Sequence, residues 1–254
     1  MKTIAIVGYG RFGELLASLC SGYFNVHVIE PDDDRRDLAA ANGHTVLNLD
    51  QLNRVDFVFL AVPISELEKL LAIVGSSLNE NQVIIDLCSV KVHPVALMKK
   101  YVKNAQILAT HPMFGPDSAS SGLSGLQVAL CPVSINQDNL KRIQDFWAHL
   151  DVITIETTPE EHDKDTVYSQ AFTYSLAKLI IGTDIPGIMF TTRSFNAIYK
   201  VAALSAKDTD QLFHDMLFYN PYFTEMKAKL EDSILKTVSI LDQIADEQAS
   251  SDNF

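Results

Sequence analysis

A glycine turn near the amino terminus constrains the fold more than any other feature of this sequence. The apolar run TIAIV at 3–7 leads directly into GYGRFG at 8–13, and helical spacing of apolar residues begins inside that motif. In such a turn the first glycine permits the tight bend, the second lets the backbone approach a ligand, and the third lets the helix pack on the strand. The motif predicts the first βαβ unit of a doubly wound sheet, with a dinucleotide pyrophosphate at the helix amino terminus.

The candidate dinucleotide-binding residues lie in this turn and behind the next two predicted strands. Glu30 ends the second strand, where a carboxylate can accept hydrogen bonds from both ribose hydroxyls, which favours NAD. Arg35 and Arg36 follow it and can pair either with the 2′-phosphate of NADP or with neighbouring aspartates, so NADP remains possible. The segment 61–63 either covers the dinucleotide or is a simple strand-to-helix turn. The full candidate set is Gly8, Gly10, Arg11, Phe12, Gly13, Glu30, Ala61, Val62 and Pro63.

The chain shows two kinds of sequence pattern, one before and one after about residue 155. Up to about residue 155, β-branched runs alternate with helical patterns, with strands predicted at 3–7, 26–29, 55–61, 83–86, 106–109 and 152–155 and helices at 12–21, 65–75, 92–102 and 137–150. Beyond Pro159 only helical periodicity remains, at 164–181, 191–204, 209–218 and 221–244. The prediction is an α/β chain with a Rossmann-type domain over 1–157, an all-helical substrate and dimerisation domain over 158–247, and a disordered tail over 248–254.

Composition narrows the possible partners. The 254 residues carry a formal net charge of −12, which opposes binding to nucleic acid or to an anionic membrane. No apolar run reaches the roughly 18 residues of a membrane span, and the first ten residues lack the pattern of a signal peptide. The three cysteines are far apart, and no cluster of His, Cys and carboxylates suggests a metal. We therefore expect a cytoplasmic protein with buried thiols and no metal site.

Candidate reacting residues follow two later strands. Ser89 comes after the strand ending at Asp86, and His111 follows the next strand in the segment ATHPMFGP. Because parallel strands present their carboxyl ends at one edge, the two side chains are expected to meet near the nicotinamide end of a dinucleotide. An imidazole with a pKa of about 6.5 can take a proton from a substrate hydroxyl. Alternatively, His111 bonds a backbone carbonyl and Ser89 caps the following helix.

The motif THPMFGP after DLCSVK, on a chain beginning IAIVGYGRFG, resembles the prephenate and arogenate dehydrogenases of tyrosine biosynthesis. The resemblance continues into the helical region. There, Glu161-His162-Asp163 followed by Ser169-Gln170 is similar to the start of the family's helical domain, and FYNP at 218–221 is similar to a helix junction of arogenate-type members. It therefore covers nearly the whole chain, and THPMFGP is its most specific element.

The resemblance implies an oxidative decarboxylation. A hydride passes from the carbinol carbon of a cyclohexadienol to NAD(P)+ while carbon dioxide departs and the ring becomes aromatic. It implies that His111 takes the proton of the 4-hydroxyl and that Ser89 hydrogen-bonds that hydroxyl or the histidine. Pro112 and Pro116 would then hold the imidazole in place by restricting the backbone. His162 and Asp163 are expected to have structural roles, as a helix cap or a brace of the cleft.

The expected substrate site departs from the family pattern. Many prephenate-specific members carry a histidine early in the helical domain, whereas the stretch 169–174 has none and Tyr174 stands where arogenate-type members tend to have a tyrosine. Lys200 aligns with a family arginine that binds the ring carboxylate. A lysine lacks the two-pronged guanidinium, so binding is expected to be looser or shared with Arg193, although Lys200 can equally be a solvated helix residue. The choice between prephenate and arogenate therefore stays open.

Three functions remain to be separated. The first is the dehydrogenase just described. The second is another two-domain NAD(P)-dependent reductase, of the imine or 3-hydroxyacid type, which predicts a catalytic lysine in the helical domain. The third is a dinucleotide-binding regulator without chemistry. In each case the apolar helix faces beyond residue 160 predict a homodimer formed mainly by those helices.

Overall fold

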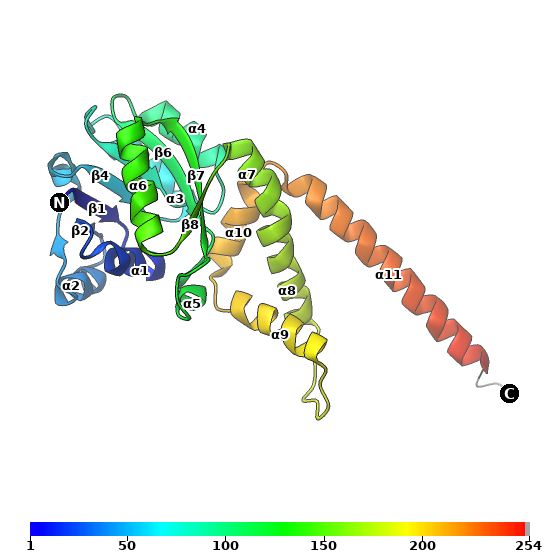
Figure 1. Ribbon diagram of the computed structural model, residues 1–254. Helices are drawn as coiled ribbons and strands as arrows, with labels where there is room; N and C mark the ends of the chain where they lie inside the picture. The colour runs from blue at the N-terminus through cyan, green and yellow to red at the C-terminus, as the bar shows by residue number, and fades with distance from the viewer. Residues whose placement is uncertain (252–254) are drawn as a thin grey trace. The chain divides into compact units, whose positions relative to one another are not determined.

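The computed structural model describes residues 1–251, which form two compact units (Figure 1). The first comprises Met1–Asp163 and Asp208–Asn220, and the second comprises Lys164–Lys207 and the described residues from Pro221 onward. This division differs from the expected boundary at 157/158. Helix α10 (Asp210–Phe218) belongs to the first unit, because the carboxylate of its buried Asp215 accepts the Ser65 N–H at 3.2 Å.

The first unit is built on one eight-stranded sheet with the order β3-β2-β1-β4-β5-β6-β7-β8. Neighbouring strands from β3 to β6 pair in parallel, β7 runs antiparallel to β6, and β8 is parallel to β7. The doubly wound α/β fold predicted from the sequence is therefore confirmed. The strands are β1 (Thr3–Val7), β2 (Asn25–Ile29), β3 (Thr45–Val46), β4 (Phe57–Leu60), β5 (Val83–Asp86), β6 (Gln106–Pro112), β7 (Gln127–Ser134) and β8 (Ile153–Glu156).

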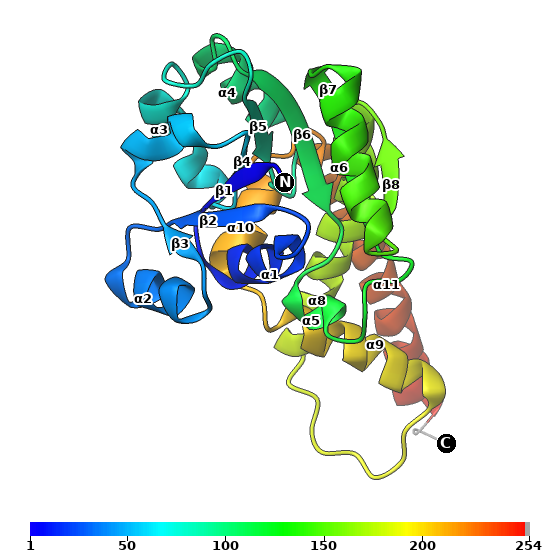
Figure 2. The same ribbon diagram turned by 60° about the vertical axis from the view of Figure 1, so that its left-hand side comes forward.

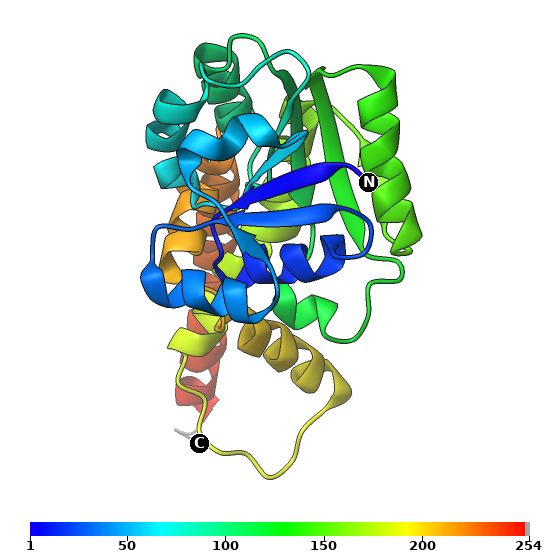
Figure 3. The same ribbon diagram turned by 90° about the vertical axis from the view of Figure 1, so that its left-hand side faces the viewer.

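Helices cover both faces of this sheet, as Figures 2 and 3 show, with α1 and α6 on one face and α3 and α4 on the other. Side chains alternate along a strand, so Ile4 and Ile6 of β1 join the core beneath α1 and α6, whereas Ala5 and Val7 join the opposite core. The helices are α1 (Arg11–Cys20), α2 (Asp33–Ala41), α3 (Ile64–Val74), α4 (Val92–Tyr101), α5 (Pro116–Ala119) and α6 (Gln137–His149), with a 3₁₀ turn at Leu49–Arg54.

Strand β6 is longer than the 106–109 expected from the sequence, and this moves His111 inside the sheet. β6 continues to Pro112 because β7, which was not expected, pairs with it and aligns His111 with Ala129. The ring is therefore carried by a strand that is paired with β7 at this position, since the pairing of β6 with β5 ends at Ala109, rather than by a loop.

The second unit is helical, as expected. Helix α7 (Pro159–Thr166) begins in the first unit and continues through a π-helical turn at Val167–Ala171 into α8 (Phe172–Gly182). Helices α9 (Arg193–Ser205) and α11 (Phe223–Ser251) follow in the second unit. The expected disordered tail is wrong for residues 248–251, which extend α11: QAS at 248–250 continues a helix without glycine or proline to stop it. Residues 252–254 of that tail lie outside the described residues. No helix within 1–251 is long and apolar enough to cross a membrane.

Candidate functional site

The carboxyl ends of the parallel strands gather the candidate residues of the first unit at one sheet edge. β1 leads into the glycine turn, β4 into residues 61–63, β5 into the segment carrying Ser89, and β6 into His111 and the loop after it. Because β1, β4, β5 and β6 are consecutive neighbours in the sheet, these segments lie next to one another. Such an edge is where ligands bind in open α/β sheets.

The three glycines of the turn have different roles. Gly8 has φ +99°, and a Cβ there would lie 2.4 Å from the Ala61 carbonyl oxygen. A Cβ at Gly13 would lie 2.1 Å from the Gly8 oxygen, so both positions are required by packing. At Gly10 the nearest atom to such a Cβ is Nη1 of Arg35, at 3.2 Å. The absence of a side chain at Gly10 thus lets the Arg35 guanidinium approach the backbone before the amino terminus of α1, where a pyrophosphate would meet a cation.

Glu30 lies beneath this turn. Its Oε2 accepts the Tyr9 N–H at 2.6 Å and its Oε1 accepts the Asp32 N–H at 3.0 Å. Arg35 donates to the Tyr9 carbonyl at 3.2 Å, and Arg36 donates to the Glu30 carbonyl at 3.1 Å. A carboxylate, which favours NAD, and two guanidinium groups, which can pair with the 2′-phosphate of NADP, therefore lie together behind the turn.

The other cofactor candidates support the turn. Arg11 donates to Asp117 of α5 at 2.5 Å, and Phe12 packs against Phe114, which joins the turn to the loop after His111. Ala61 and Val62 lie against Gly8, so the segment 61–63 is a strand-to-helix turn that backs the glycines. Pro63 directly precedes α3.

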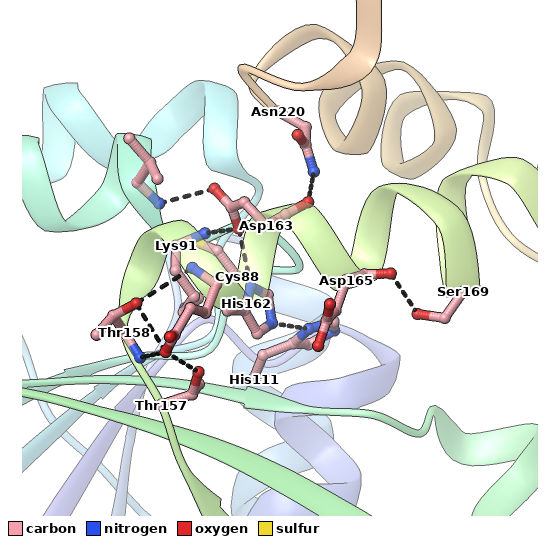
Figure 4. Close-up of polar contacts among 12 residues, drawn as sticks. Cys88, Lys91, His111, Thr157, Thr158, His162, Asp163, Asp165, Ser169 and Asn220 are labelled. Atoms are coloured by element: carbon pink, nitrogen blue, oxygen red, sulfur yellow. Dashed lines mark hydrogen bonds and ion pairs between the residues drawn. The ribbon is translucent and has the colours of Figure 1, made fainter. Parts of the chain in front are cut away.

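His111 belongs to a chain of three buried side chains (Figure 4). Its Nδ1 lies 3.0 Å from Nε2 of His162, and Nδ1 of His162 lies 2.8 Å from Oδ1 of Asp163. His111 and His162 are each 4% exposed and Asp163 is fully buried. Burial lowers the pKa of His111 well below its ordinary 6.5, and its electrostatic interactions with His162 and Lys91 act in the same direction. The imidazole is therefore neutral and able to accept a proton at physiological pH.

Asp163 is fixed by backbone groups. Its two carboxylate oxygens accept the N–H groups of Lys91, at 2.7 Å, and Val92, at 2.9 Å, where α4 begins. Its carbonyl oxygen accepts the Asn220 side-chain amide at 2.9 Å. Asn220 belongs to the FYNP segment and is the last residue of the first unit, so this hydrogen bond connects the end of that unit to Asp163.

A second buried polar pair supports the same strands. The ammonium of Lys91 contacts the carboxylate of Asp86 and donates to the Thr110 carbonyl at 2.5 Å, and both charged side chains are fully buried. Burial raises the pKa of Asp86, although the Lys91 charge opposes this shift. The pair ties the end of β5 to the residue before His111.

Ser89 is buried, and its hydroxyl has no hydrogen-bond partner among the described residues. Of the two expected partners of Ser89, His111 is therefore not bonded here, and Nδ1 of His111 faces His162 instead. A buried hydroxyl without a partner is costly. Ser89 therefore remains available to a substrate hydroxyl or another bound polar group.

Sequence reasoning missed the residues that organise His111. His162 and Asp163 were expected to have structural roles, and the Asp86–Lys91 pair was not considered. The available signal was the occurrence of adjacent His and Asp at the start of a helix, in a chain with one candidate base. Within 1–251, no group of three or more His, Cys, Asp or Glu is arranged to hold a metal ion.

The candidate substrate residues lie in the helical unit. Tyr174 is half-buried on α8, while Arg193 and Lys200 are exposed on α9. Arg193 and Lys200 are two helical turns apart and so project from one face of α9. Their proposed role in binding carboxylates stays a prediction.

Comparisons with known proteins identify the family of the chain. Residues 19–156 match the family described as "Prephenate dehydrogenase, nucleotide-binding domain". The chain is 26% identical over 238 residues to Arogenate dehydrogenase 2, chloroplastic, of Arabidopsis thaliana, which covers 90% of this chain and 66% of that protein. It is 27% identical over 228 residues to Arogenate dehydrogenase 1, chloroplastic, of the same plant, which covers 86% of this chain and 36% of that protein. The chain thus spans just under two thirds of one relative and about a third of the other.

A solved structure extends the likeness to the whole fold. The prephenate dehydrogenase of A. aeolicus, in complex with hydroxyphenyl propionate and NAD+, superimposes with a TM-score of 0.76 at 18% sequence identity. The superposition covers 98% of this chain and 93% of that one, so both the sheet unit and the helical unit have counterparts there. With the sheet, the glycine turn and a family match over more than half of the chain, the protein belongs to the prephenate dehydrogenase family.

Proposed function

We propose that this protein catalyses the NAD(P)-dependent oxidative decarboxylation of prephenate, to 4-hydroxyphenylpyruvate, or of arogenate, to tyrosine. The observation that carries the proposal is the buried His111, whose pKa is lowered by burial, at the sheet edge shared with the glycine turn and with the unpartnered hydroxyl of Ser89. This reaction needs three things from the first unit: a base, a group that orients the substrate hydroxyl, and a binding site for the cofactor pyrophosphate.

A dinucleotide would be held by the residues of the turn. The pyrophosphate would lie against the backbone at Gly10, beside Arg35, and Glu30 and Arg35 are the candidates for recognising the adenosine ribose. When bound, its nicotinamide supplies the hydride acceptor. Glu30 keeps NAD as the expected cofactor, and the neighbouring Arg35 keeps NADP possible.

His111 and Ser89 would manage the proton of the substrate 4-hydroxyl. His111 accepts that proton while Ser89 donates a hydrogen bond to the oxygen. The C–H electron pair leaves the carbinol carbon as hydride. The electron pair of the breaking bond to the carboxylate enters the ring as carbon dioxide departs. The oxygen then recovers its proton as a phenol, so the step consumes no net proton.

Arg193, Lys200 and Tyr174 are our candidates for binding the rest of the substrate. Prephenate and arogenate both carry two carboxylates, and the two cations on one face of α9 offer complementary charge. The side-chain keto or amino group is the only difference between these substrates.

The test uses purified protein with prephenate or arogenate, each with NAD+ or NADP+, followed at the absorbance of the reduced nicotinamide. We expect turnover of one substrate and its loss in His111→Asn. Binding of NAD+ without turnover in all four mixtures would contradict the proposal, favouring a regulator or a reductase of another substrate. Activity that survives in His111→Asn would contradict the assignment of the base.

We also propose that the helical unit forms a homodimer. All of α11 except Met226 is partly or fully exposed, and apolar residues recur along it at helical spacing, including Ile234, Val238 and Leu241. An apolar groove of about 340 Å³ continues this stripe against Tyr168 and other residues of the preceding helices. A second copy of the chain, supplying the same stripe, is the partner that matches it in length and chemistry.

Sedimentation at micromolar concentration tests this assembly. Leu241→Lys places a charge in the stripe and is expected to give monomers. Gln243→Lys, on the opposite side of the same helix, should leave the dimer intact. A wild-type protein that is monomeric would contradict the proposal. A reducing compartment such as the cytoplasm suits the buried, unpaired Cys20, Cys88 and Cys131.

A further inference from the structure

The Asp163 carboxylate can only accept hydrogen bonds from its surroundings. Backbone N–H groups of Lys91 and Val92 donate to its two oxygens, at 2.7 and 2.9 Å, and the amino terminus of α4 favours negative charge there. The side chain is fully buried, so these contacts fix its orientation. Any polar hydrogen between Asp163 and His162 must therefore belong to the histidine.

This requirement determines the proton on His162. Its Nδ1 lies 2.8 Å from Oδ1 of Asp163 and donates to it (Figure 4). A neutral imidazole carries one hydrogen, so Nε2 of His162 has a lone pair and accepts. That acceptor lies 3.0 Å from Nδ1 of His111, and a hydrogen bond there needs the hydrogen on His111.

We infer that His162 and Asp163 are positioning residues that hold His111 in its Nδ1–H tautomer and leave Nε2 as the basic nitrogen. The inference rests on the proposed function, in which His111 is the base. An isolated imidazole can adopt either tautomer, and only a nitrogen with a lone pair can take the substrate proton. After that transfer, the imidazolium is stabilised because its Nδ1–H points along the chain toward the Asp163 carboxylate.

The direct test is the tautomer of His111 in the full-length protein without substrate. Histidine labelled with ¹⁵N, with the His111 signals assigned by their loss in His111→Asn, is measured by long-range ¹H–¹⁵N correlation at about pH 8, where an ordinary imidazole is neutral. We expect a protonated Nδ1 and an unprotonated Nε2. A hydrogen on Nε2 of neutral His111, or a doubly protonated His162, would overturn the inference.

Two variants separate positioning from packing. His162→Asn keeps an amide donor opposite Asp163 but lacks an atom at the Nε2 position. His162→Gln can instead place an amide oxygen there to accept from His111. We expect His162→Asn to give a tautomer mixture and to lower kcat by about 10²-fold with little change in KM. His162→Gln should restore the Nδ1–H tautomer and much of kcat.

The outcomes distinguish this inference from the proposed function. If His162→Asn folds and its His111 tautomer is unchanged, the inference fails, whatever the activity. If the tautomer responds as expected but His111→Asn retains turnover, the positioning chain stands and the assignment of His111 as the base fails. If His162→Asn and His162→Gln unfold at the same temperature, a general packing defect does not explain a difference in their kcat or in the tautomer of His111.

Discussion

Replacing Lys91 by methionine should destabilise the first unit more than almost any other single substitution. The side chains of Lys91 and Asp86 are both fully buried, and the ammonium is shared between the Asp86 carboxylate and the Thr110 carbonyl. Methionine fills a similar volume, so the change removes the charge and its hydrogen bonds rather than the packing. What remains is a buried carboxylate without its counter-charge.

The magnitude follows from that uncompensated carboxylate. Removing one partner of a buried ion pair costs about 3–5 kcal/mol. Asp86 keeps the N–H groups of Cys88, at 3.1 Å, and Thr110, at 3.3 Å, which favours the lower half of that range. In Lys91→Met/Asp86→Asn the buried charge is also removed. We expect the double variant to be more stable than Lys91→Met by about 2 kcal/mol, because the amide oxygen still accepts one of these N–H groups.

Equilibrium unfolding in urea measures the loss of stability in Lys91→Met and its recovery in the double variant. Repeating it at several pH values shows whether the loss grows or shrinks as the pH rises. Burial raises the pKa of Asp86 and loss of the Lys91 charge should raise it further. A carboxyl whose folded-state pKa exceeds its unfolded value binds more protons when folded, so the free energy of unfolding falls as pH rises. The loss of unfolding free energy in Lys91→Met, relative to the wild type, should therefore be largest near about pH 8 and shrink toward about pH 5. A deficit below about 1 kcal/mol, or one that grows on acidification, would refute the reasoning.

Four further predictions test other parts of the first unit. Gly8→Ala should cost about 3 kcal/mol or more in chemical denaturation, since its Cβ would meet the Ala61 oxygen at 2.4 Å with φ at +99°. Gly10→Ala should unfold like the wild type but bind NAD+ at least about tenfold more weakly by calorimetry. The lowered pKa of His111 means that the unfolded chain binds more protons below about pH 6.5. Stability should fall on acidification there, and His111→Asn should remove that part of the dependence. Burial raises the pKa of the Cys131 thiol to about 12, so a thiol reagent should label it only as fast as the protein unfolds.

The doubly wound architecture was predictable because its signals are local. Apolar periodicity located β1 and β5 with the bounds that the structure has, and the glycine turn specified the first crossover. Strand β7 was missed because its pairing with β6 is not local and its sequence QVALCPVS contains Pro132, which argues against a central strand. Pro132 is tolerated where the register of the β6–β7 pair shifts, opposite Leu108.

The candidate site was predictable in its parts and not in its connections. Motif position selected His111 and Ser89, yet the sequence offered no means of pairing His111 with His162, which lies 51 residues away. That contact depends on β6, which is longer than expected and carries His111, and on the start of α7, which carries His162 and belongs to the first unit. Buried polar partners of this kind are decided by tertiary packing, which local propensity does not report.

Lys91 connects the two buried networks through different atoms, and this makes them separable. Its backbone N–H holds Asp163, and through it His162 and His111, whereas its ammonium holds Asp86 and Thr110. Lys91→Met removes only the second set of contacts. The variant should therefore lose stability as calculated while the Nδ1–H tautomer of His111 persists in its ¹⁵N spectrum under native conditions. Loss of both together would mean that the segment between Asp86 and Lys91 is fixed by the ion pair rather than by the amino terminus of α4.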